Sequence, residues 1–344
     1  MKEHYFTGEI DTETGSIPVV ATSLSFLDKL GDWKVRWTLG RGKYMVVPGI
    51  YATGSPAKDS PVMVSANYKL SFDMLRQALA GFDTWILVLD TKGVNVWCAA
   101  GKGTFGTAEI VRRIEETGLT KIVNHREIIV PQLGAPGVSA GEVKKRSGFS
   151  VKYGPVRAED LSAFLGAGKK TTAEMRTVKF EMRDRLKLIP AEIMIYSKYL
   201  LLLSIIFFLS SGFGPDDYIF GRAINTGVYA VTALLAAFFS GTVINAILLP
   251  WLPGRSFSVK GFYAGLFTGC VLFLVGRNSV NNFELWAWLI LVPAISSFLA
   301  MNFTGASTYT SLSGVKKEMK IAIPIQAAAI LIGVVLWIIG RFVA

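Results

Sequence analysis

Hydrophobic and polar positions divide the chain into two unlike parts. Charged residues, Gly, Pro and short apolar runs alternate through the first 165 residues, as they do in water-soluble domains. From about residue 188 onward, long uncharged apolar segments dominate instead. Five of them approach the roughly 20 apolar residues that a helix needs to cross a bilayer. These five predicted spans cover residues 190–212, 223–249, 258–276, 284–303 and 321–340.

The loops between the spans differ in charge. Basic residues gather ahead of the first span and in the loops after the second and fourth spans, including Lys187, Arg255 and Lys317. The opposite loops hold only Arg222 and Arg277, beside acidic residues. The positive-inside rule therefore predicts a multi-pass protein of the cytoplasmic membrane, with its soluble domain in the cytoplasm and its C-terminus outside.

The pattern between residues 40 and 165 predicts an α/β domain. Short apolar runs at 45–54, 61–66, 84–90, 121–131 and 149–155 are typical of buried strands. Helical periodicity marks the segments between them, and we expect Ser71 to cap a helix over 71–82 and a Thr to cap one over 107–118. A third helix is predicted over 158–168, whereas residues 1–30 are polar and poorly patterned.

This alternation predicts a mostly parallel, Rossmann-like sheet with helices on its faces, followed by an all-α transmembrane domain of five helices. The predicted boundaries are 1–165 for the soluble domain, 166–188 for a basic linker and 189–344 for the membrane domain. Ligands of such sheets bind beyond the carboxyl ends of the strands.

Charge and cysteine content narrow the chemistry. The net charge of +11 lies largely beside the predicted membrane, where anionic lipid attracts it, so we expect membrane lipid and no nucleic acid as a partner. Two cysteines are too few for an iron–sulfur cluster or a Cys-rich zinc site. Cys270 lies inside a predicted span, where a small apolar residue at a helix contact explains it. Cys98 is left to explain.

Several motifs compete for the segment around Cys98. Residues 101–106 match G-x-G-x-x-G, but the preceding strand ends at Asp90, eleven residues before Gly101, whereas a dinucleotide fingerprint follows its strand directly. A P-loop is excluded because Gly103, and not Ser or Thr, follows Lys102. His125 could pair with Cys98 in nucleophilic catalysis, but a structural hydrogen bond is the simpler interpretation of this histidine.

A cofactor ligand is a further interpretation of Cys98. Asn95 could cap a short helix, placing Cys98 in its first turn, where the helix dipole and Lys102 would favour the thiolate that ligates metals. The small residues beside the thiol could let a flat ligand approach the backbone; they are Ala99, Ala100 and Gly101. Trp97 offers an apolar face next to them. A buried structural cysteine in a glycine-rich turn explains the same residues equally well.

The segment NVWCAAGKGTFGT (95–107) resembles the signature of corrinoid proteins related to the large subunit of the corrinoid iron–sulfur protein, and specifically of the mercury-methylating HgcA family. The resemblance extends from about residue 40 to the end of the chain, including the five spans. Four further segments carry it: VSANYKLSFDMLR (64–76), VPQLGAPGV (130–138), GFSVKYGPVRAEDL (148–161) and MNFTGASTYTSLSGVKKEM (301–319).

The resemblance implies a cobalamin-type corrinoid in the base-off state, with Cys98 as the lower axial ligand of cobalt. Other positions carry over as cofactor-binding residues: Ser65, where relatives commonly have Thr, and Asn95, Val96, Trp97, Cys98, Ala99, Ala100, Gly101 and Lys102. The cysteine-rich cluster segment of the iron–sulfur subunit is absent from the sequence. This difference separates the chain from acetyl-CoA synthesis and favours mercury.

The implied reaction is methyl transfer from methyl-Co(III) to Hg(II), which gives methylmercury. Thiolate ligation should favour departure of the methyl group with electron density, because a thiolate donates charge through the metal. The resemblance also implies two partners, a ferredoxin-like 4Fe–4S protein of the HgcB type as reductant and a methyl donor linked to methyltetrahydrofolate. Two alternatives remain: a membrane-anchored corrinoid methyl carrier in one-carbon and acetyl-CoA metabolism, and a transporter with a regulatory domain.

Overall fold

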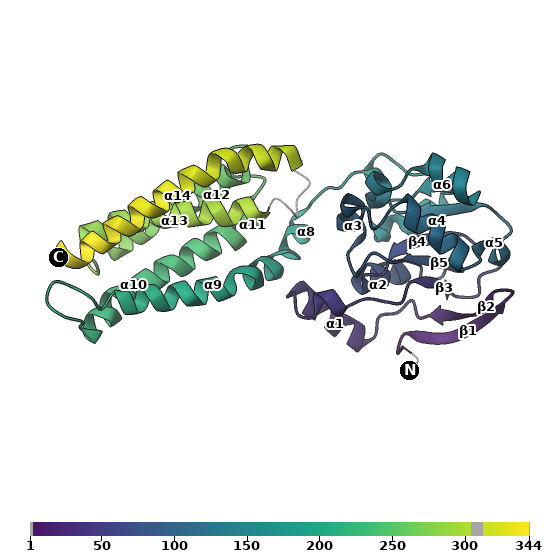
Figure 1. Cartoon of the computed structure of the whole chain (residues 1–344), viewed down its shortest axis with the longest axis horizontal. Helices are drawn as coiled ribbons and strands as arrows, with labels where there is room; N and C mark the ends of the chain where they lie inside the picture. The colour runs from purple at the N-terminus through teal and green to yellow at the C-terminus, as the bar shows by residue number, and fades with distance from the viewer. Residues whose placement is uncertain (1–2, 304–311, 344) are drawn as a thin grey trace. The chain divides into compact units, whose positions relative to one another are not determined.

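The computed structural model describes residues 3–303 and 312–343 (Figure 1). They form two compact units, Met1–Lys179 and Phe180–Ala344, and the division falls inside the predicted linker 166–188. Each unit has buried apolar clusters of its own, so each is described by itself.

A seven-stranded mixed sheet forms the centre of the first unit, in the order β1-β2-β3-β5-β4-β6-β7. Its strands are β1 (Phe6–Thr12), β2 (Gly15–Val20), β3 (Gly49–Thr53), β4 (Val62–Ala66), β5 (Thr84–Leu89), β6 (Glu127–Val130) and β7 (Ser150–Tyr153). The four neighbours β5, β4, β6 and β7 run parallel, whereas β3 runs antiparallel to β5. The predicted parallel sheet is therefore confirmed for these four strands and does not extend to β3.

Helices cover both faces of this sheet. They are α1 (Phe26–Arg36), α2 (Lys69–Ala78), α3 (Val96–Lys102), α4 (Thr107–Glu116), α5 (Leu119–Ile122), α6 (Ala140–Ser147) and α7 (Leu161–Gly166), with 3₁₀ turns at Arg41–Lys43, Gln132–Gly137, Ala158–Asp160 and Glu174–Arg176. Alternate residues of a strand point to opposite faces. Val64 and Leu87 therefore join the core under α3 to α6, while Met63 and Ile86 join the core under α2 and α7.

The first 36 residues are more ordered than their sequence pattern predicts. β1 and β2 pair as an antiparallel hairpin at the edge of the sheet, and Ser25 and Asp28 form a capping box at the start of α1. Helix α1 buries Asp28 against Lys69 instead of an apolar stripe. Because hydrophobic periodicity detects only apolar faces, this helix left no signal in the sequence.

Both predicted helix caps need correction. Helix α2 begins at Lys69 after Tyr68, so Ser71 lies within it and caps nothing. Thr107 is the first residue of α4 rather than its cap, and its hydroxyl accepts a hydrogen bond from the Ser139 N–H at 2.9 Å. Neither helix has a side-chain cap, and at the start of α2 the Lys69 N–H donates to the Tyr44 carbonyl at 3.1 Å.

The second unit is all helical. Its helices are α8 (Met182–Leu186), α9 (Ile189–Ser210), α10 (Phe220–Phe239), α11 (Asn245–Leu248), α12 (Phe257–Gly276), α13 (Asn282–Asn302) and α14 (Leu312–Val343), with a π-helical turn at Ser240–Ile244. Five helical segments of the described residues are long and apolar enough to cross a membrane, as the sequence predicts. Part of the resembling segment 301–319, residues 304–311, lies outside the described residues.

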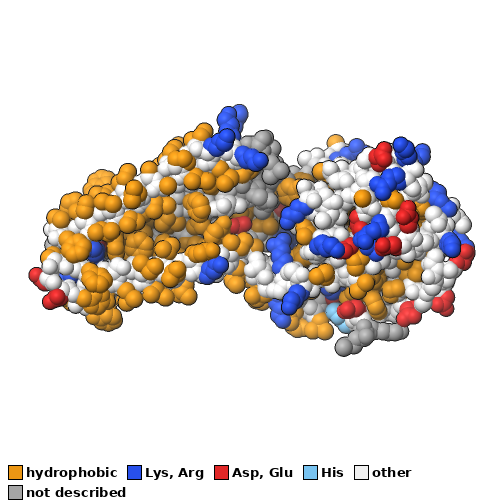
Figure 2. Space-filling model, in the orientation of Figure 1, with side chains coloured by type: hydrophobic (Ala, Val, Ile, Leu, Met, Phe, Trp, Pro, Cys, Tyr) orange, Lys and Arg blue, Asp and Glu red, His pale blue; other side chains and the backbone are white. Residues whose placement is uncertain are grey.

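Surface chemistry differs between the units. Figure 2 shows hydrophobic side chains spread over the helices of the second unit, and basic and acidic side chains mixed over the first. Large apolar side chains such as Phe267 and Val275 are more than 70% exposed on α12. Such exposure is costly in water and favourable in lipid, so it supports the predicted spans.

Candidate functional site

The loop that follows β5 is a tight turn. Lys92 has φ 57° and Gly93 has φ 69°, and two consecutive left-handed residues are what a type I′ turn requires. The Val94 N–H donates to the Thr91 carbonyl at 3.2 Å and closes the turn. The chain therefore reverses abruptly between the strand and the residues that carry the thiol.

A buried side chain just after the neighbouring strand β4 accepts three hydrogen bonds from this turn. The Asn67 Oδ1 atom accepts hydrogen bonds from the Thr91 N–H at 3.1 Å, the Thr91 hydroxyl at 2.8 Å and the Gly93 N–H at 3.0 Å. Asn67 is 2% exposed and directly follows β4. Sequence reasoning missed this residue, although an Asn at the carboxyl end of a buried strand is a signal that could have found it.

Asp90 adds charge to the same turn. Burial alone would raise the pKa of Asp90, but hydrogen bonds donated by the Lys92 ammonium and backbone N–H hold that pKa below its ordinary value. The Asp90 N–H donates in turn to Glu109 of α4 at 2.8 Å. The turn is thereby fixed to the sheet on one side and to α4 on the other.

Cys98 lies on the first turn of α3, as the sequence predicts. The Asn95 Oδ1 atom accepts from the Cys98 N–H at 2.9 Å and caps the helix. The Cys98 side chain is exposed, and neighbouring Trp97 is 37% exposed. Gly103, at φ 82°, ends α3 in the left-handed conformation. The interpretation of Cys98 as a buried structural cysteine is therefore wrong.

The small residues of α3 serve close packing. Ala99 and Ala100 are buried, and α3 rests on the 3₁₀ segment Gln132–Gly137. A Cβ atom at Gly137 would lie 2.2 Å from the Phe105 carbonyl oxygen and 3.1 Å from the Ala100 Cα atom, so only glycine allows this approach. A Cβ atom at Gly101, in contrast, would meet nothing within 4 Å, and Gly101 and Lys102 are both exposed. Of the predicted cofactor-contacting small residues, only Gly101 presents an open face.

A cavity of about 280 Å³ opens beside α3. It lies at the carboxyl ends of the parallel strands, where residues of β4 and those that follow β6 and β7 meet. Its lining is mostly apolar, and four predicted site residues share it: Ser65, Asn95, Val96 and Trp97. Other lining residues come from the three segments Ile129–Leu133, Gly154–Ala158 and Ser71–Leu75. The lining does not include Cys98, whose exposed thiol lies one residue beyond Trp97.

The geometry excludes the dinucleotide site and the catalytic pair of Cys98 with His125. Helix α3 contains Gly101 and separates Gly103 and Gly106 from β5, so residues 101–106 cannot form the strand–turn–helix of a dinucleotide site. The His125 Nε2 atom lies 2.9 Å from the Ser60 carbonyl oxygen, and its Nδ1 atom accepts from the Glu127 N–H at 3.2 Å. His125 precedes the amino end of β6, at the edge of the parallel strands opposite to Cys98. It is a structural residue.

Comparison with known proteins places similarity on this unit. Residues 37–165 match the family described as CO dehydrogenase/acetyl-CoA synthase delta subunit, a range that includes the cavity and α3. The acetyl-CoA decarbonylase/synthase complex subunit gamma of Methanopyrus kandleri is 34% identical over 122 residues, 35% of this chain and 26% of that protein. The Archaeoglobus fulgidus subunit gamma is 30% identical over 131 residues, 38% of this chain and 27% of that protein.

The chain thus spans about a quarter of the length of these curated relatives. The predicted relation to the large subunit of the corrinoid iron–sulfur protein is confirmed for residues 37–165, whereas the predicted separation from proteins of acetyl-CoA synthesis is not supported by these similarities. Helices α8 to α14 lie outside the matched range. The finer resemblance, to mercury-methylating proteins, stays a prediction.

Proposed function

We propose that this chain is a membrane-anchored corrinoid protein that carries a methyl group in one-carbon metabolism, with the Cys98 thiolate as the lower ligand of cobalt. One observation carries the proposal. Cys98 stands exposed on a capped helix turn, at the border of an apolar cavity at the carboxyl ends of parallel strands. The same residues lie in the range that is similar to subunits of acetyl-CoA synthesis.

The cavity fits part of a corrinoid. At about 280 Å³ it is smaller than the roughly 300–1,000 Å³ of pockets that bury a whole drug-sized ligand. Its lining residues, among them Val96, Leu133 and Ser65, would offer apolar surface and one hydroxyl group to a flat heteroaromatic group such as the lower base of a corrinoid. Cys98, whose exposed thiol lies outside the lining, would then be the residue that holds cobalt.

The protein's own contribution is to hold and tune that ligand. A bound corrinoid supplies a cobalt centre that accepts and donates methyl groups. Asn95 accepts a hydrogen bond from the Cys98 N–H and so fixes the backbone of that residue at the start of α3. A thiolate donates more charge to a metal than an imidazole does. As a ligand of cobalt, Cys98 would therefore favour release of the methyl group with electron density.

That property supports Hg(II) as a second candidate acceptor. Hg(II) is an electrophile, so it takes a methyl group together with the bonding electron pair, whereas a carrier for acetyl-CoA synthesis gives up a methyl cation and keeps the pair on the metal. Transfer to Hg(II) thus leaves the metal two electrons poorer after each turnover. Within this candidate function, a ferredoxin-like protein of the HgcB type would return them and a methyltetrahydrofolate-linked donor would supply the methyl group.

The helices of the second unit are proposed as the anchor. Their length and exposed apolar side chains support insertion in a bilayer, and the distribution of basic loops favours a cytoplasmic first unit with the C-terminus outside. Anchoring is simpler than transport, although Lys198 lies midway along α9. Glu284, at the start of α13, is paired with Arg341 near the end of α14.

Replacement of Cys98 tests the assignment. Cys98→Ala, compared with Cys270→Ala as the matched control, should change the absorption spectrum of the full-length protein reconstituted with cobalamin and abolish methyl transfer. Cys98→His should retain binding with weaker transfer to Hg(II). Unchanged spectra and transfer in Cys98→Ala would refute Cys98 as the ligand.

The identity of the methyl acceptor is tested by whether turnover requires a reductant. Protein loaded with labelled methyl cobalamin is offered Hg(II) or tetrahydrofolate, and labelled products are quantified with and without a low-potential reductant. With excess labelled methyltetrahydrofolate as the methyl source, repeated turnover to methylmercury only when the reductant is present supports the Hg(II) candidate. Transfer to tetrahydrofolate alone would leave the carrier function and eliminate mercury.

A further inference from the structure

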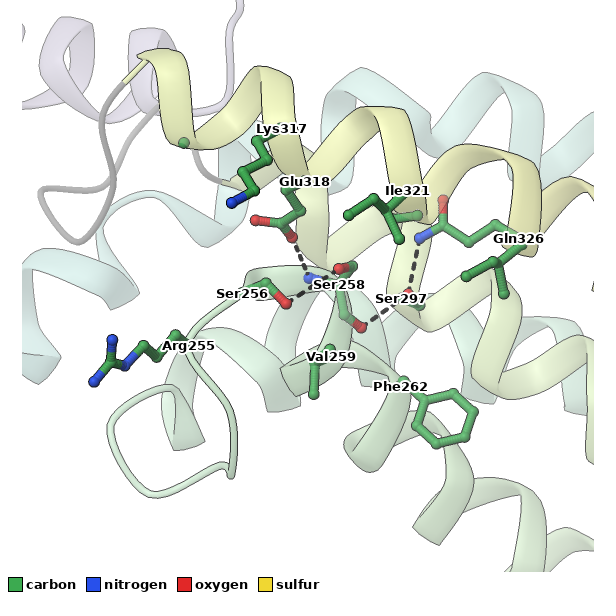
Figure 3. Close-up of a pocket in the computed structure, with 13 residues that line it drawn as sticks. Arg255, Ser256, Ser258, Val259, Phe262, Ser297, Lys317, Glu318, Ile321 and Gln326 are labelled. Carbon is green, nitrogen blue, oxygen red and sulfur yellow. Dashed lines mark hydrogen bonds between the residues drawn. The ribbon is translucent and has the colours of Figure 1, made fainter.

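The second unit contains a cavity of about 500 Å³ among α12, α13 and α14 (Figure 3). Two cations, Arg255 and Lys317, line one end of it. Figure 3 shows Phe262 and Gln326 toward the other end. Between the ends, the wall is apolar and consists mainly of Val259, Ile321, Ala322 and Ile325.

A chain of hydrogen bonds crosses the cavity wall. The Ser258 N–H donates to Glu318 Oε1 at 2.6 Å, and the Ser297 hydroxyl donates to the Ser258 carbonyl at 2.8 Å. Gln326 Nε2 donates to the Ser297 oxygen at 2.8 Å. These bonds tie α12, α13 and α14 together and occupy the one acidic side chain of the lining.

Gln326 is left half satisfied. It is 5% exposed, and no donor among the described residues reaches its Oε1 atom. Buried polar atoms without a partner are rare in folded proteins, and a missing partner is one explanation for them.

A second cavity of about 240 Å³ extends the first. The two share Phe262, Ser297, Ile325 and Gln326, and the second continues along the apolar residues Leu266, Leu289, Ile290, Pro293, Ala294 and Ala329. Its lining carries no charged residue. Together they form a groove that is cationic at one end, polar near its middle and apolar beyond.

Charge and shape select one kind of occupant. Arg255 and Lys317 contribute two positive charges and Glu318 one negative charge, so the charged end has a net charge of +1. A free anion would use the cations but not the apolar extension, and a neutral lipid would use the extension but not the cations. An acidic glycerophospholipid matches both, because its phosphate carries the negative charge and its acyl chain the apolar surface.

We propose that this groove binds one acidic glycerophospholipid, with its phosphate between Arg255 and Lys317 and an acyl chain along Phe262 and Ile325. The inference rests on the proposed membrane anchoring and is independent of the corrinoid. It makes α14 a lipid-responsive element, since Lys317, Glu318, Ile321, Ile325 and Gln326 all lie on that helix.

Native mass spectrometry of the full-length protein tests the proposal. Protein in detergent micelles is titrated with dioleoyl phosphatidylglycerol or dioleoyl phosphatidylcholine. The number of lipid molecules that stay bound after the detergent is removed in the spectrometer is then counted. We expect the acidic lipid to be retained preferentially. Arg255→Gln with Lys317→Gln should weaken its retention roughly tenfold or more, because each lost cation removes attraction for the phosphate.

Lys316→Gln with Lys320→Gln is the matched control. These lysines flank Lys317 on α14, and the cavity lining does not include them, so the control removes the same charge and should change retention less than twofold. The single variant Lys317→Gln, at an exposed position, serves if the double variant does not fold. Equal loss in both double variants, or retention in Arg255→Gln with Lys317→Gln, would overturn the proposal.

Glycerol 3-phosphate distinguishes a lipid site from an anion site. It carries the phosphate without the acyl chains, so millimolar concentrations should leave the bound lipid in place, and efficient displacement would contradict the lipid. The spectrum of the cobalamin-loaded variant is recorded in parallel. Altered lipid retention with an unchanged spectrum supports this site whatever the outcome for Cys98, while release of the protein from membranes by carbonate would refute the anchoring first.

Discussion

The two units bury polar groups in different ways. In the first unit, Lys69 binds Asp28 and Asp73 at 2.6 Å each, Arg76 binds Asp73 at 2.8 Å, and the side chains of all four are at most 8% exposed. In the second unit, buried polar contacts between helices use hydroxyls and an amide, as at Ser240, Ser296 and Gln326. The buried ion pair of Arg341 with Glu284 lies near the ends of α14 and α13. The contrast is that of water and lipid, since a charge inside a bilayer costs more than a hydroxyl or an amide.

Glycines have two roles in the chain. Gly93 and Gly103 of the first unit supply left-handed backbone at turns. Gly137 of the first unit and Gly265 of the second allow close packing instead, since a Cβ atom at Gly265 of α12 would come within 2.7 Å of the Pro293 Cα atom of α13. In the second unit this packing brings two helices together.

Removal of one buried cation should have the largest effect. Arg76→Met leaves Asp28 and Asp73 short of a partner, so we expect the first unit to lose about 3–5 kcal/mol of unfolding free energy. Pulse proteolysis of the full-length protein measures it. Arg112→Met removes an exposed cation that pairs with Glu109, and it should lower the unfolding free energy far less than Arg76→Met does. Equal losses would contradict the importance of burial.

Loosening the turn beneath Cys98 should come next. Asn67→Ala removes the acceptor of three hydrogen bonds, and leaving those donors unpaired costs about 1–3 kcal/mol locally. Under the proposed function, cobalamin affinity falls about tenfold and amide hydrogen exchange accelerates over residues 90–98. Exposed Asn124 provides the control, Asn124→Ala, which should change neither quantity.

Two glycines of α12 distinguish the effect of close helix packing from the effect of helix propensity. Gly265→Ala should destabilise the second unit by about 1–2 kcal/mol, because backbone of α13 blocks the added methyl group. At Gly269 the nearest atom would be 3.5 Å away, so Gly269→Ala should be neutral or stabilising by up to about 1 kcal/mol. Thermal unfolding in nanodiscs measures both, and identical effects would refute the proposed helix contact.

The smallest effect concerns pH. Burial, together with the nearby Asp73 carboxylate, raises the pKa of Asp32 to about 6. The folded state therefore holds a proton that the unfolded state has released, and stability falls as pH rises from about 4 through 6. Asp32→Asn keeps an acceptor for the Tyr44 hydroxyl and should stabilise the first unit above pH 6 by at most about 1 kcal/mol, since Asp32 is only partly buried. Asp59→Asn, at an exposed position, should leave the pH profile of the melting temperature unchanged.

Local signals in the sequence predicted much of this architecture. The apolar runs of β4 and β5, the Asn95 cap and the five apolar helices depend on neighbouring residues, so pattern reasoning finds them. Helix α1 and Asn67 escaped because their contacts join residues far apart in the sequence. The packing role of Ala99 and Ala100 escaped for the same reason, since it depends on Gly137 of a later loop.

The hydrogen bonds that hold the thiol have a consequence for engineering. Asn95 accepts from the backbone of residue 98, and Asn67 holds the preceding turn, so neither contact uses the Cys98 side chain. These bonds therefore fix the backbone of residue 98 while leaving the identity of its side chain open. Under the proposed function, selenocysteine, histidine or methionine installed at this position on an unchanged backbone would form a graded series of electron donors to a bound metal.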